Sequence, residues 1–72
     1  MKTDKYEIII YWSGEDNAFV AEVPELAGCV AHGPTHEKAL ANAKKAIRLW
    51  VESAIEFGDS VPLPKGRRLM LA

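Results

Sequence analysis

The chain has a single cysteine, Cys29, and so cannot form an internal disulfide. This excludes a small secreted protein stapled by disulfides, and a reducing cytoplasm is the expected location. No apolar run approaches the roughly 20 residues that a membrane helix requires. The N-terminus runs directly into a strand pattern, with no apolar signal-peptide core. At 72 residues, the chain is expected to form one small domain over residues 1–72, with a thin margin of stability.

The chain also has little net charge, −1 at pH 7, which argues against general nucleic-acid binding. The charges are unevenly distributed along it. Residues 1–36 carry two lysines against six acidic residues, a balance of −4, whereas residues 37–72 carry seven basic against four acidic residues, a balance of +3. A polarised surface of this kind would help to select a charged partner. An ordinary charged shell on a small protein is the simpler reading of the same numbers.

Three short strands are expected, over residues 5–12, 18–23 and 29–32. The first two segments are rich in β-branched and aromatic residues. The turn-forming residues 13–17 between them predict a hairpin. Pairing should end near Pro24, because proline cannot donate a hydrogen bond to a ladder.

A single long helix is expected over residues 36–57. Thr35 is a suitable N-cap, and Gly58 stands where a residue in the left-handed conformation commonly ends a helix. Apolar residues recur at steps of three and four and define the predicted buried stripe: Leu40, Ala43, Ile47, Trp50, Ala54 and Phe57. A last strand over residues 67–71 would give the order β-β-β-α-β. This is an α+β fold, with one helix on one face of a small antiparallel sheet.

The predicted hairpin has large apolar residues on both faces. In the first strand, Ile8, Ile10 and Trp12 alternate with Ile9 and Tyr11. One helix covers only one face, whereas a half-solvated sheet should alternate apolar and polar residues. Burying one isoleucine contributes about 2 kcal/mol, a large share of the roughly 5 kcal/mol that holds a small domain together. We therefore expect a homo-oligomer, a dimer or tetramer, or a stable hetero-complex. A strongly twisted sheet with an apolar open face is the alternative.

The sequence offers only weak candidates for catalytic or metal-binding chemistry. Cys29, His32 and His36 have metal-like spacing, but they supply three ligands where a structural zinc site takes four. Cys29 and His32 are also three residues apart in a strand and should point to opposite faces, so we expect a buried cysteine and exposed histidines. Glu7 and Glu22, expected on neighbouring strands, are too few carboxylates for a two-metal nuclease. We predict no enzyme activity, no metal and no cofactor.

Four motifs follow one another along the chain. They are Tyr6-x-Ile8-x-Ile10, Ala18-Phe19-Val20-Ala21-x-Val23-Pro24-x-Leu26-x-Gly28-Cys29, Gly33-x-Thr35-x-Glu37-x-Ala39 and, after the helix, Val61-Pro62-x-Pro64. Together they closely resemble the HicB antitoxin family over about residues 6–64. Ala27 stands where the family usually has a second proline before the glycine.

The resemblance implies a degenerate RNase H-like domain in a prokaryotic type II toxin–antitoxin system. Such a domain would bind and neutralise HicA, a small basic toxin that cleaves messenger RNA, commonly within a higher-order complex. Family members often add a C-terminal DNA-binding domain. This chain ends at Ala72, so direct operator binding is not expected of it.

The expected contact residues combine the uncovered apolar face with the acidic first half, which would attract a basic partner. They are Ile9, Tyr11, Val20, Glu15, Asp16 and Glu22. The same patch would equally suit a homodimer. Two other functions stay open: a stand-alone oligomeric interaction module without a toxin, and a nuclease that binds Mg²⁺ or Mn²⁺ at Glu7 and Glu22.

Overall fold

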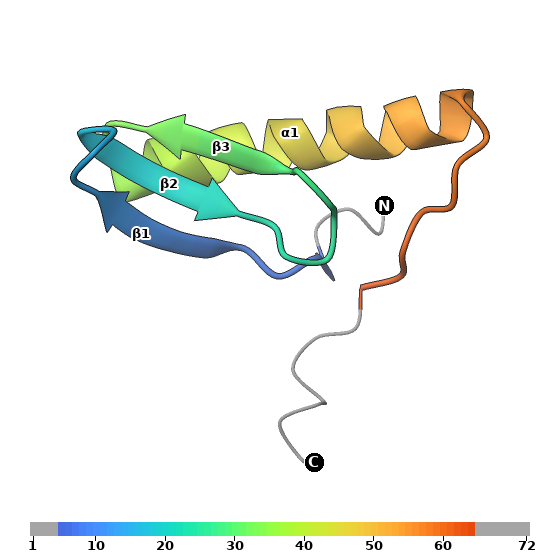
Figure 1. Cartoon of the computed structure of the whole chain (residues 1–72), viewed down its shortest axis with the longest axis horizontal. Helices are drawn as coiled ribbons and strands as arrows, with labels where there is room; N and C mark the ends of the chain where they lie inside the picture. The colour runs from blue at the N-terminus through green and yellow to red at the C-terminus, as the bar shows by residue number, and fades with distance from the viewer. Residues whose placement is uncertain (1–4, 65–72) are drawn as a thin grey trace, which may run out of the picture.

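The computed structural model describes residues 5–64. Three strands, β1 (Ile9–Ser13), β2 (Ala18–Glu22) and β3 (Val30–Gly33), precede one helix, α1 (His36–Glu56). The strands form an antiparallel sheet in the order β1-β2-β3, and α1 lies along one face of it (Figure 1). The predicted α+β architecture is confirmed. The strand expected at residues 67–71 lies outside the described residues. The RNase H-like assignment and the single domain over residues 1–72 stay predictions.

β1 begins at Ile9, later than the predicted start at residue 5. Ile9 pairs with Glu22, the last residue of β2. Beyond it, the N–H of Val23 donates to the carbonyl of Cys29 at 3.0 Å, and Pro24 has no N–H to offer. The residues before β1 therefore have no ladder to join. Tyr6 packs into the core instead, and its hydroxyl donates to the carbonyl oxygen of Pro62.

α1 begins and ends at the predicted capping residues. The N–H of Lys38 donates to Oγ1 of Thr35 at 3.0 Å, and Gly58 has a φ of 76°. The buried stripe, however, is Ala39, Ala43, Ile47, Val51 and Ala54, rotated from the predicted one. Phe57, predicted to be buried, is 74% exposed. It is the C-cap of a helix that extends well beyond the ends of the strands, where no sheet lies opposite it (Figure 1).

The close approach of α1 to the sheet explains this rotation. A Cβ atom at Gly33 would lie 2.4 Å from the backbone nitrogen of Ala39. Small residues therefore face each other here, and Ala21, Ala39 and Ala43 form a buried cluster between sheet and helix. α1 packs mainly under β3 and less under β1. As a result Trp12, on the helix side of β1, is left more than half exposed.

A second, larger cluster fills the space beyond the strands, between α1 and the loop that joins β2 to β3. Its buried members are Tyr6, Val23, Leu26, Cys29, Ile47 and Val51. The loop is held by a hydrogen bond from the N–H of Cys29 to the carbonyl of Leu26 at 3.0 Å. Gly28 supplies a φ of 75°, and Nε1 of Trp50 donates to the carbonyl of Ala27 at 2.9 Å. The loop therefore holds β3 in place as the edge strand of the sheet.

Candidate protein-binding face

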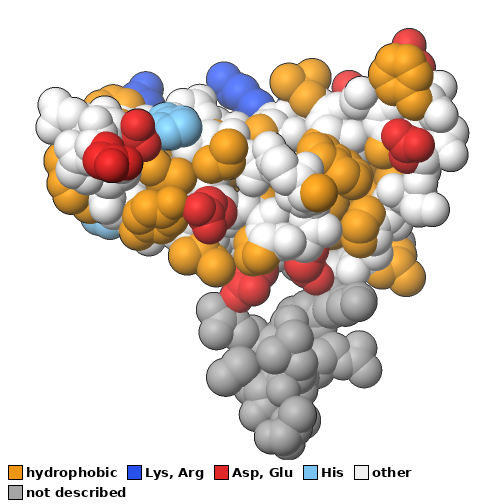
Figure 2. Space-filling model, in the orientation of Figure 1, with side chains coloured by type: hydrophobic (Ala, Val, Ile, Leu, Met, Phe, Trp, Pro, Cys, Tyr) orange, Lys and Arg blue, Asp and Glu red, His pale blue; other side chains and the backbone are white. Residues whose placement is uncertain are grey.

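The candidate site is the sheet face opposite α1, called here the outer face. The strand register places these side chains on it: Ile9 and Tyr11 of β1, Val20 and Glu22 of β2, and Val30 and His32 of β3. Figure 2 shows this side of the molecule, with hydrophobic side chains spread over the strands and acidic side chains among them. The face is thus both apolar and acidic.

The apolar part of the outer face is open to solvent at its two flanks. Ile9, Tyr11 and Val30 are 41%, 42% and 47% exposed. Val20 lies between Tyr11 and His32 in the register and is only 4% exposed, because the larger side chains on both neighbouring strands cover it. Val20 therefore forms the floor of the face, and Ile9, Tyr11 and Val30 offer the apolar surface.

Glu22 is held in place on this face by Tyr11. The Tyr11 hydroxyl donates to Oε2 of Glu22 at 2.8 Å, across the β1–β2 pair. The hydrogen bond to this carboxylate is the main cause that raises the pKa of Tyr11 above its usual 10.0. The phenol is protonated at neutral pH, as tyrosines ordinarily are, and the raised pKa lets it keep donating to higher pH. The carboxylate stands among apolar neighbours in a fixed orientation, with further acceptor capacity for a partner's cation.

A second carboxylate stands at the end of the outer face, in the turn between β1 and β2. The Ser13 hydroxyl donates to Oδ2 of Asp16 at 3.0 Å, and the Asp16 N–H donates back to Oγ of Ser13 at 3.3 Å. Nε2 of His32 lies 3.6 Å from the same Asp16 oxygen. Glu15 is exposed in the same turn. The predicted acidic residues therefore border the apolar surface, with Glu22 within it and Asp16 and Glu15 at one end.

The histidines and the cysteine are arranged as expected from the sequence. His32 and His36 are exposed and Cys29 is buried, and burial raises the pKa of the Cys29 thiol. Within residues 5–64, no three His, Cys, Asp or Glu residues are grouped so that they could hold a metal ion. Glu7 was predicted to lie on a strand beside Glu22. This prediction is wrong, because Glu7 precedes β1. Its N–H donates to Oε1 of Glu25 at 3.3 Å.

Sequence reasoning missed two residues of the outer face, Val30 and His32. Their signal is the alternation of a strand, which separates residues 30 and 32 from residues 29 and 31. The direction of that alternation depends on the register with β2, and Glu22 pairs with Val30.

Within residues 5–64, no helix is long and apolar enough to cross a membrane.

A small antiparallel sheet that is backed by one helix and open on an apolar, acidic face has the features of a small α+β binding protein. The chain belongs to the HicB-like antitoxin family of bacterial toxin–antitoxin systems, whose sequence model matches residues 6–69. The predicted resemblance is confirmed. Membership of an antitoxin family is typical of a regulator, and the absence of catalysis stays a prediction.

Relatives cover most of the chain. A UPF0150 protein of Thermoplasma acidophilum is 41% identical over 58 residues, which is 81% of this chain and 83% of that protein. A UPF0150 protein of Synechocystis is 40% identical over 57 residues, 79% of this chain and 77% of its own length. A UPF0150 protein of Helicobacter pylori is 46% identical over 37 residues, 51% of each chain. No solved structure matches.

Proposed function

We propose that this chain is the antitoxin of a type II toxin–antitoxin pair, and that it neutralises a HicA-type, mRNA-cleaving toxin by binding it through the outer face. The carrying observation is the combination of exposed Ile9, Tyr11 and Val30 with the hydrogen-bonded carboxylates of Glu22 and Asp16. The apolar residues supply the desolvated centre of an interface, and the carboxylates select the partner.

Charge complementarity favours a toxin that acts on RNA as the occupant. A protein that binds RNA needs a basic surface to neutralise phosphates. Four of the five Lys and Arg residues in the described range lie on α1. Glu15, Asp16 and Glu22 border or lie on the outer face. The side of the molecule in Figure 2 accordingly shows its Lys and Arg side chains only along the edge above the sheet. A basic partner is steered to this face and away from α1.

Neutralisation on this scheme is steric and needs no catalytic group. A toxin whose basic surface is covered by the outer face has no surface left for its RNA. The affinity comes from burial of the apolar side chains, whereas the carboxylates mainly increase the association rate and make binding weaken with salt. The interaction takes place in the cytoplasm, where the messenger RNA is.

The test is co-expression with a HicA-type toxin, sought first as a short basic reading frame beside the gene of this chain, followed by native mass spectrometry and calorimetry at low and high salt. Ile9→Glu places a charge in the apolar surface, and we expect it to weaken binding by about 30-fold or more. Glu22→Lys should weaken binding most at low salt. Ile55→Glu is the control, because Ile55 is 67% exposed on α1 and lies away from the outer face.

Equal binding by Ile9→Glu and Ile55→Glu would contradict the assignment of the face. The absence of any complex with a basic partner would instead favour a stand-alone interaction module. Dissociation of a homo-oligomer by Ile9→Glu, without any toxin complex, would assign the outer face to a second copy of the chain.

A further inference from the structure

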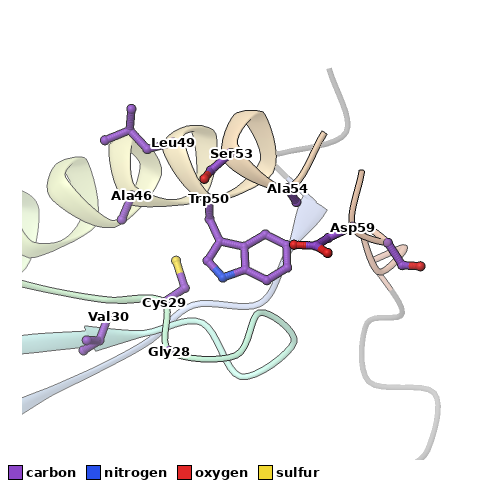
Figure 3. Close-up of a pocket in the computed structure, with 10 residues that line it drawn as sticks. Gly28, Cys29, Val30, Ala46, Leu49, Trp50, Ser53, Ala54 and Asp59 are labelled. Carbon is purple, nitrogen blue, oxygen red and sulfur yellow. The ribbon is translucent and has the colours of Figure 1, made fainter. Parts of the chain in front are cut away.

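α1 carries an apolar surface that the outer face does not include. Leu49 is 65% exposed and projects from α1 away from the sheet (Figure 3). Beside it, an open groove of about 830 Å³ runs between the C-terminal half of α1 and the segment from Gly28 to Val30. Ala46 and Ser53, the small residues on either side of Leu49 along the helix, line the same groove. Small neighbours around one large side chain permit a second helix to approach to about 8–10 Å.

The charges on this side of α1 are segregated along its length. At 100° per residue, one stripe contains Lys38, Lys45, Leu49, Glu52 and Glu56. The part before Leu49 is basic, and the part after it is acidic. Within residues 5–64, none of these four charged side chains forms an ion pair.

The acidic end of this stripe is unfavourable for an isolated helix. The last turn of α1 has no basic residue, and Glu56 is the last residue of the helix. The C-terminal end of a helix carries partial negative charge, so carboxylates there are repelled. A cation supplied from outside the chain would relieve this repulsion.

We infer that a second copy of this chain supplies those cations, by packing its α1 antiparallel against this one about a two-fold axis near Leu49. In this arrangement a residue before Leu49 lies opposite a residue a similar distance after it in the other copy. With a rise of about 1.5 Å per residue, Lys45 lies ~6 Å before Leu49 and Glu52 lies ~4.5 Å after it. Lys45 of each copy therefore lies beside Glu52 of the other. Lys38, ~16.5 Å before Leu49, is offset by ~6 Å from Glu56, which lies ~10.5 Å after it, so the Lys45–Glu52 pairs set the orientation.

The antiparallel arrangement is the one that the charges select. Parallel packing would place Lys45 against Lys45 and Glu52 against Glu52, which is repulsive. The exposed ion pairs contribute little stability by themselves, so they set orientation, while Leu49 and the groove supply the buried surface. The symmetry is isologous, because the same patch serves both copies, and the assembly closes as a dimer. Of the outer-face residues only Val30 also lines this groove. Ile9, Tyr11 and Glu22 stay free in the dimer, so toxin binding through them is tested separately.

The test is sedimentation equilibrium of the full chain over a wide concentration range. Leu49→Asp and Ile55→Asp form a matched pair, since both residues are on α1, both are apolar, and their exposures are 65% and 67%. We expect a dimer for the wild type and for Ile55→Asp, and a dimer dissociation constant raised about 30-fold or more for Leu49→Asp. Circular dichroism of each variant verifies that the monomer stays folded.

A charge exchange tests the orientation. Lys45→Glu alone should weaken the dimer, and the double variant Lys45→Glu/Glu52→Lys should restore it, because each copy then offers the reversed pair. A monomeric wild type at every concentration, or equal dimer stability for Leu49→Asp and Ile55→Asp, would overturn the inference. Dissociation of the dimer by Ile9→Glu and not by Leu49→Asp would also overturn it. If Leu49→Asp weakens the dimer but leaves toxin binding unchanged, the dimer interface and the toxin-binding face are distinct.

Discussion

Gly33 sets how closely α1 approaches the sheet, and Gly33→Ala is the sharpest test of that packing. The added Cβ would lie 2.4 Å from the nitrogen and 2.9 Å from the Cα of Ala39, and 2.7 Å from the carbonyl carbon of Lys38. All three atoms are backbone, so no side-chain rotation relieves the overlap. The first turn of α1 must move away from β3, which loosens the small cluster formed by Ala21, Ala39 and Ala43.

The expected cost follows from the size of this displacement. Overpacking of a tight core typically costs 1–3 kcal/mol, and we expect about 2 kcal/mol here. A domain of this size loses ~4–8 °C of melting temperature per kcal/mol, so Gly33→Ala should melt about 8–16 °C below the wild type. A cost of about 2 kcal/mol is a large share of a total stability of roughly 5 kcal/mol.

Gly14→Ala is the matched control. A Cβ at Gly14 meets nothing within 4 Å, and both substitutions remove the same glycine freedom from the unfolded chain, a gain of about 0.4–1 kcal/mol. The difference between the two variants, measured by thermal circular dichroism, therefore isolates the overlap with α1. If the two variants melted within about 2 °C of each other, the close approach of helix and strand would be refuted.

Three further predictions concern single groups. Both tyrosines should titrate above pH 10, Tyr11 mainly through its bond to Glu22 and Tyr6 mainly through burial. Because these pKa values are raised in the folded state, the stabilisation they provide is present at neutral pH and is lost as the pH rises through them. An ultraviolet titration in which Glu22→Gln, which keeps both phenols, left the curve unchanged would disprove the role of Glu22. The buried Cys29 thiol, whose pKa burial raises, should react with iodoacetamide far more slowly in the native chain than in urea, and equal rates would show that the residue is accessible. Thr35→Ala removes the acceptor for the Lys38 N–H and should cost ~1 kcal/mol in urea unfolding, whereas Thr35→Ser should retain most of it.

The features that sequence predicted well are those with a local cause. Thr35 caps the helix and Gly58 ends it, since each acts through its own backbone or through a hydrogen bond three residues away. The alternation of β1 placed Ile9 and Tyr11 on the face opposite the helix, because a strand has a period of two whatever its partner. Glu22 followed once the two strands were recognised as a hairpin.

The features that sequence predicted wrongly depend on contacts between distant segments. Steps of three and four fit two adjacent stripes of α1, and the choice of Ala39 over Leu40 is made by the approach of Gly33. Residues 5–8 have strand composition, but β2 offers them no partner beyond Glu22. Val20 is buried because it occupies the middle strand, which only the strand order reveals. Leu49 lies outside the predicted buried stripe and is exposed.

The hydrogen bond from Tyr6 to the carbonyl of Pro62 has a consequence for how this protein is made. The donor and the acceptor are 56 residues apart in the chain, and Val61 packs against the same core cluster as Tyr6. A nascent chain that stops short of residue 62 leaves the Tyr6 hydroxyl without this acceptor and its core cluster without Val61. This part of the core is therefore completed only after residues 61 and 62 have left the ribosome, although Tyr6 is made much earlier.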